Sequence, residues 1–403
     1  MLISAHEAIR RLGVKPATLY AYVSRGLVRS TPSAGSKEHR YYAADVERLK
    51  RGKRKGRRTG APLSSFDVYA PVLDSSLCLL EGGRLYYRGL DATHLAERAT
   101  LEEVAELMWG GPNGFPLSGS QVPAGFRTWL QELGPKATSI ERAKTILVRL
   151  ATDDIAAIDT SLPGVLRVGR RLVPLLASSI TGKMPTKTPI HEQLARAWGL
   201  DAIGADIVRR CLVLVADHEL NASTYVARCV ASTGATPYAV VLAAMCALSG
   251  PIHGGAASKL EAMLSEFIAS KDIKARIIDR LRFGDGVPGF GHPLYPEGDP
   301  RAIAILDALK RAFPQRKTAV IFQIASEVQG LSGRAPYVEF ALAATSLLLR
   351  LPPGSALGLF LVGRTVGWIA HAIEQYASGV IIRPRARYVG ILPSEIDDPA
   401  QDR

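Results

Sequence analysis

The sequence predicts an all-α fold, in which a small helix-turn-helix-like module precedes a large helical body. From about residue 64 onward the dominant pattern is helical, with apolar residues at Ile140, Ala143, Ile146, Leu147 and Leu150. We find neither an internal repeat nor a regular alternation of strands and helices. With 403 residues, of which 47% are hydrophobic and 22% charged, the chain is long and apolar enough to bury a sizeable core.

Residues 1–50 have the sequence pattern of a helix-turn-helix module. Its first helix is predicted to begin at Ser4, which has Glu7 at capping-box spacing, and to end at Gly13. The second helix, a loop, a wing-like segment and a third helix follow at residues 15–26, 31–36, 39–42 and 45–50. This order resembles the DNA-binding domain of MerR-type regulators, so we expect a small winged helix-turn-helix domain. We interpret the Gly-interrupted basic segment at residues 51–63 as a linker, either solvated or in contact with nucleic acid.

The basic residues are concentrated in this N-terminal part. Residues 1–60 hold 15 of the 50 Lys and Arg but only 4 of the 37 Asp and Glu, so they carry +11 of the net charge of +13. We therefore expect weak DNA binding through residues 1–60, driven mainly by phosphate contacts. Candidates for base contacts are Lys15, Thr18 and Tyr22, but no Arg, Asn or Gln occurs between Lys15 and Ser24. A module that contacts protein rather than DNA is the alternative.

Several classes of protein are disfavoured. No CxxC spacing occurs among the four cysteines, which are Cys78, Cys211, Cys229 and Cys246. Their spacing favours reduced thiols in a cytoplasmic protein over a zinc site or disulfides. The longest apolar stretches, residues 238–248 and 340–349, are shorter than the about 20 residues of a membrane span, so we interpret them as core helices. A GxGxxG string at residues 284–289 follows no predicted strand, and the clearest strand-like segment is residues 76–88, with a turn at 81–83.

Three histidines lie in distinctive sequence settings. His218 is part of DHELNAST at residues 217–224, while His253 and His292 are each flanked by glycine, in GPIHGGA and GFGHPLY. Glycine lets the backbone approach a ligand closely and leaves an imidazole unobstructed as a neutral donor or general acid. A lone histidine in a helical protein is usually structural, but two glycine-embedded histidines favour a functional site.

Three arginines, Arg301, Arg364 and Arg383, are candidates for binding carboxylates, since a guanidinium group can bind a carboxylate bidentately. Taken singly, Arg301 and Arg383 have the pattern of surface ion-pair partners. Arg364 differs because it lies between Leu361 and Val366, in apolar sequence that should be buried. A buried arginine needs an anion, so Arg364 predicts an anionic ligand or partner.

In order and approximate spacing, these blocks resemble the citrate synthase family, from about residue 64 to residue 390. The blocks that carry the resemblance are YRG at 87–89, DHELNAST, GPIHGGA, GFGH followed by DPRA, GRTVGWIAHAIEQ at 363–375 and RPR at 383–385. The resemblance implies an all-α fold with a large domain, residues 64–255 and 364–403, and a small domain, residues 256–363, that closes over the substrate. It also implies a homodimer in which the RPR segment reaches the partner's active site.

The resemblance further implies a role for each block. His253 would hydrogen-bond the thioester oxygen of the acyl-CoA and stabilise its enol or enolate, and His292 would polarise the keto carbonyl of oxaloacetate. The family's base is the aspartate of a Pro-Asn-(Val/Ile)-Asp-Phe motif, and this chain has PYVEF at residues 336–340, so Glu339 would be the base. The carboxylates of oxaloacetate would be held by His218, Arg301, Arg364 and Arg383. The resemblance implies neither a metal nor a cofactor. Acetyl-CoA takes part as a substrate, not as a cofactor.

The expected reaction is the condensation of acetyl-CoA with oxaloacetate to give citrate and CoA. Pro293, Pro296 and Ala257-Ser258 depart from the family pattern where it meets CoA or follows HGGA. One alternative is a 2-methylcitrate synthase using propionyl-CoA, because one carbon in an apolar pocket is worth only about 1–3 kcal/mol. A second alternative, from another class, is a carboxylate-sensing DNA-binding regulator with weak or no catalysis.

Overall fold

In the computed structural model, the residues described are 2–14, 16–24, 28–32, 39–46, 73–110, 122–134 and 137–384. The chain divides into two compact units, residues 1–73 and residues 74–403. Lys15, Arg385 and the predicted linker at residues 51–63 lie outside the described residues.

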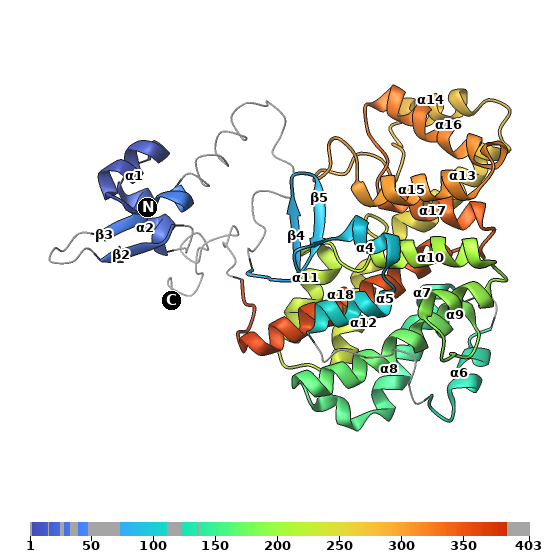
Figure 1. The fold of residues 1–403 in the computed structure, drawn as a ribbon, viewed down its shortest axis with the longest axis horizontal. Coiled ribbons are helices and arrows are strands. Elements are labelled where there is room, and N and C mark those ends of the chain that lie inside the picture. The colour runs from blue at the N-terminus through green and yellow to red at the C-terminus, as the bar shows by residue number, and fades with distance from the viewer. Residues whose placement is uncertain are drawn as a thin grey trace, which may run out of the picture. The chain divides into compact units, whose positions relative to one another are not determined.

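Among its described residues, the N-terminal unit has two short helices, a helical stretch at residues 43–46 and a three-stranded antiparallel sheet (Figure 1). Its elements, with the sheet order β1-β3-β2, are β1 (Leu2–Ile3), α1 (Ala5–Leu12), α2 (Pro16–Ser24), β2 (Ser30–Pro32) and β3 (His39–Tyr42). As predicted, Ser4 is the N-cap of α1, and its side chain accepts a hydrogen bond from the backbone N–H of Glu7 at 3.2 Å. Gly13 ends α1 with a φ of 63°, a left-handed conformation that turns the chain towards α2. Leu19 and Tyr41 are buried in the small core between helices and sheet.

The C-terminal unit is mostly helical but begins with a small antiparallel sheet. Its strands are β4 (Cys78–Glu81), β5 (Arg84–Tyr87) and β6 (Leu90–Asp91). Gly82 and Gly83 form the turn between β4 and β5 with φ values of 59° and 75°, which a tight hairpin turn requires. The predicted strand-like segment at residues 76–88 is therefore confirmed. The all-α fold class is corrected in part, because short aliphatic and aromatic runs beside turns form a small sheet in each unit.

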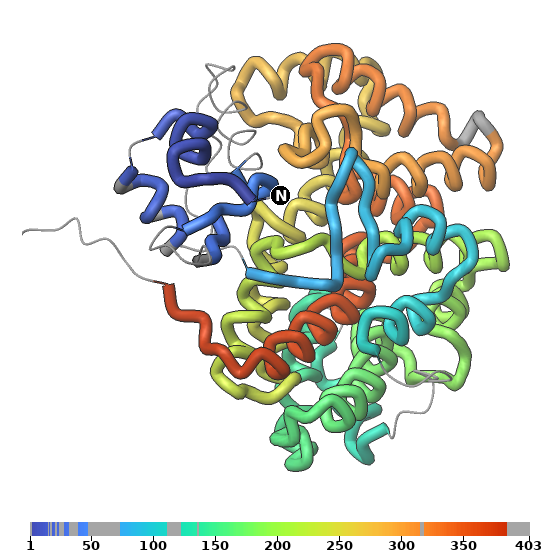
Figure 2. The backbone as a smooth tube through the Cα atoms, turned by 60° about the vertical axis from the view of Figure 1, so that its left-hand side comes forward, coloured from blue at the N-terminus to red at the C-terminus, as the bar shows by residue number. Residues whose placement is uncertain are grey.

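Two groups of helices make up the rest of the C-terminal unit (Figures 1 and 2). The first group surrounds α18 (Ser355–Ser378) and consists of α4 (Ala92–Arg98), α5 (Leu101–Trp109), α6 (Phe126–Glu132), α7 (Ser139–Asp153), the 3-10 helix Ile155–Ile158, α8 (Leu162–Thr181), α9 (Ile190–Ala197), α10 (Ala202–Leu214), α11 (Ala222–Ala231) and α12 (Pro237–Leu248). The second group lies at one end of the unit and consists of α13 (Gly255–Ala269), α14 (Ile273–Arg282), α15 (Pro300–Ala312), α16 (Gln315–Ser332) and α17 (Val338–Leu348). The helical patterns predicted at residues 140–150 and 239–248 are confirmed as α7 and α12.

Helix α18 packs against α5, α8, α10, α11, α12 and α17. It is long and apolar enough to cross a membrane, yet 94% of its most apolar window is buried inside the protein, as expected of a core helix. A Cβ atom at Gly363 would lie 2.6 Å from the carbonyl oxygen of Leu212, and one at Gly367 would lie 2.3 Å from that of Ala216. These two glycines therefore let α18 approach the chain segment that leads into the DHELNAST block.

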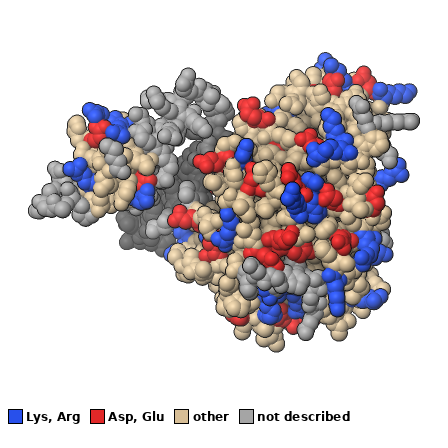
Figure 3. Space-filling model, in the orientation of Figure 1, with Lys and Arg blue, Asp and Glu red and all other residues tan. Residues whose placement is uncertain are grey.

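Charges on the C-terminal unit are mixed. On the face shown in Figure 3, Lys and Arg side chains are interspersed with Asp and Glu side chains over this unit. The sequence agrees, because residues 61–403 carry a net charge of only +2 out of the total of +13. All four cysteines are free thiols.

Candidate active site

The DHELNAST block forms the connection between α10 and α11, and His218 within it is buried. Its Nε2 atom lies 2.9 Å from the hydroxyl of Tyr295, which belongs to the loop before α15. Burial, and next the charge of Arg301, lower the pKa of His218 well below its usual value, so its imidazole is neutral. Burial raises the pKa of Tyr295, so the phenol keeps its proton and can donate it to the neutral ring.

His292 lies beside His218, with the two ring planes perpendicular and their centroids 5.4 Å apart. The backbone N–H of Leu294 points at Nδ1 of His292 from 3.2 Å, which makes Nδ1 an acceptor and leaves the ring proton on Nε2. Burial, followed by the charge of Arg301, lowers the pKa of His292 to about 4. His292 is therefore a neutral imidazole with an N–H group available to a carbonyl oxygen.

His253 lies in the turn between α12 and α13. Its Nε2 atom is 3.0 Å from the hydroxyl of Ser223, which also accepts a hydrogen bond from the indole N–H of Trp368 at 3.3 Å. The ring packs edge-on against Phe360, with centroids 6.1 Å apart. Burial, followed by the charge of Arg364, lowers the pKa of His253 to about 4, so this imidazole is neutral as well.

The glycines beside His253 and His292 meet two different demands. Gly291 has a φ of 84°, a conformation that residues with a side chain rarely adopt, and a Cβ there would lie 2.7 Å from the side chain of Arg334. At Gly254 and Gly255, a Cβ would approach neighbouring atoms to 2.4 Å and 2.7 Å. Glycine before His292 thus serves the backbone conformation, and glycine after His253 serves close packing.

Glu339 is a buried carboxyl group in the first turn of α17, exposed by 9%. Its Oε2 atom has no hydrogen-bond partner in the structure. Burial raises the pKa of Glu339 to about 7, although the nearby charge of Arg301 opposes the shift. A carboxyl group with such a pKa can act as a base near neutral pH.

Arg301, near the start of α15, forms a buried ion pair with Asp299, the N-cap of the same helix. Its Nε and Nη2 atoms donate to Oδ1 and Oδ2 of Asp299 at 3.0 Å and 2.7 Å. Oδ2 of Asp299 also accepts the backbone N–H of Val338 at 3.0 Å, which ties the start of α15 to the start of α17 and hence to Glu339. The position of Arg301 is therefore fixed by a neighbour two residues away.

Arg364, on α18, is fully buried, as the sequence predicted. Its Nε atom donates to the carbonyl oxygen of Val215 at 2.8 Å, but Nη1 and Nη2 have no partner. Burial lowers the pKa of Arg364, and the carboxylate of Asp217 opposes this effect. Arginine keeps its proton in proteins, so these two nitrogens form a cationic fork without an anion.

The structure brings six of the seven predicted site residues into mutual electrostatic range. Next to burial, the charge of Arg364 contributes to the lowered pKa of His218 and His253, and that of Arg301 to the lowered pKa of His218 and His292. Arg301 also opposes the burial that raises the pKa of Glu339. The seventh residue, Arg383, is exposed beyond the end of α18 and contributes to none of these shifts. Among the described residues, no three His, Cys, Asp or Glu side chains lie close enough together to hold a metal ion.

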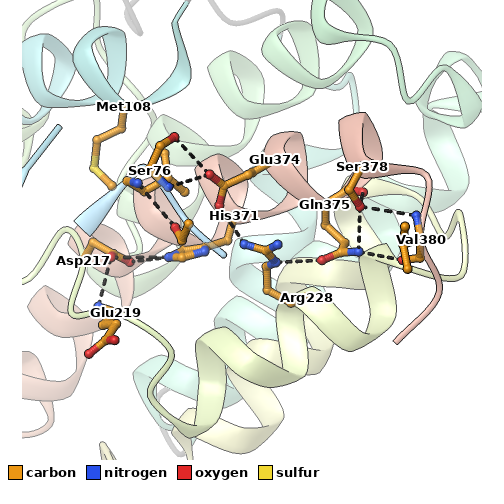
Figure 4. A network of polar contacts seen from close by, with 12 residues as sticks. Ser76, Met108, Asp217, Glu219, Arg228, His371, Glu374, Gln375, Ser378 and Val380 are labelled. Carbon is orange, nitrogen blue, oxygen red and sulfur yellow. Dashed lines mark hydrogen bonds and ion pairs between the residues drawn. The ribbon is translucent and has the colours of Figure 1, made fainter. Parts of the chain in front are cut away.

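The sequence analysis missed several residues that shape the site. Ser223 contacts His253, Tyr295 contacts His218, and Asp299 pairs with Arg301. Asp217 and His371, which Figure 4 shows facing each other, form a fully buried pair with Nε2 and Oδ1 3.3 Å apart. All of these residues lie within or next to the sequence blocks that were singled out, so their positions were visible but their contacts were not.

Comparisons with known proteins identify the family to which most of this chain is similar. The family model described as "Citrate synthase, C-terminal domain" matches residues 69–385. The citrate synthase of Haloferax volcanii is 31% identical over 358 residues, which cover 79% of this chain and 93% of that protein. The 2-methylcitrate synthase of Shewanella oneidensis is 26% identical over 350 residues, covering 79% and 92%.

Solved structures are similar over the same part of the chain. The citrate synthase of Thermotoga maritima matches with a TM-score of 0.68 and 30% identity, covering 83% of this chain and 97% of that one. The citrate synthase of Thermoplasma acidophilum, in a ternary complex with carboxymethyl coenzyme A and oxaloacetate, matches in fold with a TM-score of 0.66 and 24% identity, covering 82% and 97%. The family model does not extend to residues 1–68.

Proposed function

The chain belongs to the citrate synthase family, and we propose that it condenses acetyl-CoA with oxaloacetate to give citrate and CoA. The observation that carries this proposal is the buried guanidinium group of Arg364, whose two Nη atoms lack partners. An uncompensated buried cation is costly, and a carboxylate of the oxo acid would compensate it bidentately. His218 and Arg301, which lie in electrostatic range of Arg364, would hold the substrate beside it.

The proposed chemistry uses one base and two neutral imidazoles. Glu339 removes a proton from the α-carbon of acetyl-CoA, and a hydrogen bond from His253 stabilises the negative charge that develops on the thioester oxygen. The α-carbon attacks the keto carbon of oxaloacetate, whose oxygen takes up the Nε2 proton of His292. The proton taken up by Glu339 replaces the one that His292 gave up, so both groups return to their starting forms. Water then adds to the thioester carbon, and the CoA thiolate leaves with one proton of the water, which releases citrate and CoA. The pKa of about 7 for Glu339 and of about 4 for both histidines supports these roles.

The assembly of the site is part of the proposal. The helices α13 to α17 occupy residues 255–348, inside the small domain proposed at residues 256–363, which would close over the substrate and exclude water. The large domain is proposed at residues 64–255 and 364–403.

Arg383 is exposed in a single chain, which is compatible with a homodimer in which Arg383 completes the active site of the partner. We also propose a cytoplasmic location, supported by the four free cysteines.

The test is CoA thiol release from acetyl-CoA and from propionyl-CoA, each with and without oxaloacetate. Release that requires oxaloacetate and is faster with acetyl-CoA supports the proposal. Faster release with propionyl-CoA would instead favour a 2-methylcitrate synthase, the activity named for the Shewanella relative. Absence of oxaloacetate-dependent release with both thioesters would contradict an enzymatic function.

A second function is favoured by the N-terminal unit. We propose that residues 1–50 form a MerR-like winged helix-turn-helix module, and that residues 1–60 have weak affinity for DNA. Support comes from the order α1, turn, α2 and antiparallel β2–β3 pair, and from the +11 charge of residues 1–60. If the C-terminal unit bound oxaloacetate without turnover, the whole chain would be a carboxylate-sensing regulator rather than an enzyme.

A further inference from the structure

Asp217 and His371 are buried charged or polar residues to which the proposed chemistry assigns no role. Both side chains are fully buried, and Nε2 of His371 lies 3.3 Å from Oδ1 of Asp217. The hydrogen-bond contact of His371 is with the other carboxylate oxygen, Oδ2, at 3.4 Å. Oδ2 also accepts the backbone N–H of Glu219 at 3.1 Å, while Oδ1 has no hydrogen-bond partner among the described residues. Burying a carboxylate is expensive unless it is paired and hydrogen-bonded, so the contacts with His371 and Glu219 stabilise Asp217 in this position.

The contact with Glu219 closes a strained turn around His218. Glu219 has a φ of 55°, in the left-handed region, which costs a residue with a side chain on the order of 1–3 kcal/mol. His218 lies directly between Asp217 and Glu219, so the hydrogen bond from Glu219 to Asp217 spans it. The direction of the His218 side chain is thereby fixed by a turn that would otherwise relax.

The chain segment from Val215 to Asp217 lies against α18 at three successive positions along that helix. Arg364 donates to the carbonyl oxygen of Val215, a Cβ at Gly367 would lie 2.5 Å from Oδ1 of Asp217, and His371 pairs with Asp217. Positions 364, 367 and 371 are spaced by three and four residues, so they lie on one face of the helix. This face sets the position of the cationic fork of Arg364 relative to the His218 turn.

We propose that Asp217 and His371 are a positioning pair for recognition of the oxo acid, holding His218 and Arg364 in the geometry that binds its carboxylates. This inference rests on the proposed function and deepens it. Neither residue needs to touch the substrate. Loss of the pair should therefore weaken oxaloacetate binding selectively and leave the acyl-CoA site, built around His253 and Glu339, largely intact.

The test compares Asp217→Ala with Asp217→Asn, and His371→Leu with His371→Gln, all in the full chain. Asn keeps an oxygen for the N–H of Glu219, and Gln keeps an N–H for the carboxylate of Asp217, so both should recover part of the lost affinity. We expect Asp217→Ala and His371→Leu to raise the KM for oxaloacetate about tenfold or more, equivalent to about 1.4 kcal/mol, and to change the KM for acetyl-CoA less than about twofold.

Glu374→Gln is the matched control. It lies on α18 one turn after His371 and weakens a different ion pair, between Oε2 of Glu374 and Nη1 of Arg228 at 2.7 Å (Figure 4). Its melting temperature should fall, while both KM values stay unchanged. Equal increases in both KM values for the Asp217 and His371 variants, or no rescue by Asn and Gln, would overturn the positioning role.

Calorimetric titration of the same variants with oxaloacetate alone separates this inference from the proposed reaction. If the unmodified chain binds oxaloacetate without turnover, the reaction proposal fails, yet the affinities still test the positioning pair. Wild-type affinity in folded Asp217→Ala and His371→Leu would then refute the pair. If the unmodified chain binds no oxaloacetate, both proposals fail together with the carboxylate site.

Discussion

The guanidinium carbon of Arg364 lies 4.8 Å from the ring centroid of Phe360. His253 also packs edge-on against this ring, with centroids 6.1 Å apart. One aromatic side chain on α18 thus contacts both the cation proposed for the oxo acid and the imidazole proposed for the thioester. Because Arg364 and His253 share this neighbour, the groups proposed for the two substrates lie close together.

Replacement of Arg364 by Leu should abolish the thermal stabilisation that oxaloacetate or citrate gives the protein. A ligand that binds only the folded state stabilises it by mass action, by about 2.7 kcal/mol at 100 times its Kd. Without the cationic fork, the carboxylate loses its bidentate partner. The measurement is the shift in melting temperature with increasing ligand, and a wild-type shift in Arg364→Leu would contradict the carboxylate role.

The melting temperature of Arg364→Leu without ligand gives a second test of the role of Arg364. Arg364 is buried with two unpartnered nitrogens, so its removal should not lower the melting temperature of the unliganded protein much, and should even raise it if Leu fills the space. Arg364→Lys is the matched control, since it keeps the charge without the planar fork. We expect it to retain only part of the ligand-induced shift.

Glu339→Gln should reduce turnover by several orders of magnitude while oxaloacetate still binds, because the amide cannot accept the α-proton. In the unmodified enzyme, the base must be ionised, so kcat/KM should fall as pH drops through about 7, the pKa of Glu339. The pH-rate profile measures this limb. An acid limb near pH 4.5, or near-normal turnover by Glu339→Gln, would exclude Glu339 as the base.

The raised pKa of Glu339 should also make the free energy of unfolding depend on pH. Burial raises the pKa of Glu339 from 4.5 to about 7, so the folded state binds a proton that the unfolded state releases between these values. The free energy of unfolding of the wild type should therefore decrease, relative to Glu339→Gln, as pH rises from about 4.5 to 7. Urea titrations of both proteins at several pH values provide the comparison. A constant difference would show that the pKa of Glu339 is not raised by folding.

Tyr295→Phe tests the contact that His218 receives from the loop before α15. The phenol donates to Nε2 of His218 at 2.9 Å, and its removal leaves a buried imidazole nitrogen without a partner, at a cost of about 1–3 kcal/mol. We expect the KM for oxaloacetate to rise several-fold, with a smaller change in kcat. Tyr376→Phe is the control: Tyr376 lies on α18 and donates its hydroxyl to the carbonyl oxygen of Ala235, so its replacement should leave this KM unchanged.

Part of this site could be predicted from the sequence because its signals are local. Arg364 is flanked by apolar residues at helical spacing, which was enough to predict its burial. The pair Asp217–His371 could not be predicted, because its members are 154 residues apart and periodicity says only that a position is buried, not what it meets. Asp299 and Arg301 are only two residues apart, but a helix N-cap that doubles as an ion-pair partner has no distinct sequence pattern.

The fold likewise has parts that local sequence signals predict and parts that depend on contacts between distant residues. The hairpin of β4 and β5 was predicted, because a Gly-Gly turn between apolar runs is a strong local signal. In the N-terminal unit, the wing-like segment predicted at residues 39–42 coincides with β3. The pairing of β3 with β1 was not predicted, since β1 is only two residues long and lies some 40 residues earlier in the chain. Strands this short have no measurable periodicity, so their pairing depends on tertiary contacts.

The last prediction concerns DNA binding by the N-terminal unit. Of the candidate base-reading residues, Tyr22 packs partly against the small core, whereas Tyr20 on the same helix α2 is 61% exposed. Side chains that form bidentate contacts with bases are scarce on this helix, so the +11 charge of residues 1–60 should dominate and binding should be weak and insensitive to sequence.

A DNA titration of the full chain beside a chain that starts at Ser64 separates the two units. The full chain should bind with an affinity that falls steeply as salt rises, because each phosphate contact releases counterions, and the shortened chain should not bind. A full chain with Lys53, Arg54 and Lys55 replaced by Gln distinguishes the linker from the module: a reduced salt slope assigns the contacts to the linker. Equal binding by the full and shortened chains, or no binding by either at low salt, would refute a DNA role for residues 1–60. The positive charge concentrated in these residues would then not serve to bind DNA.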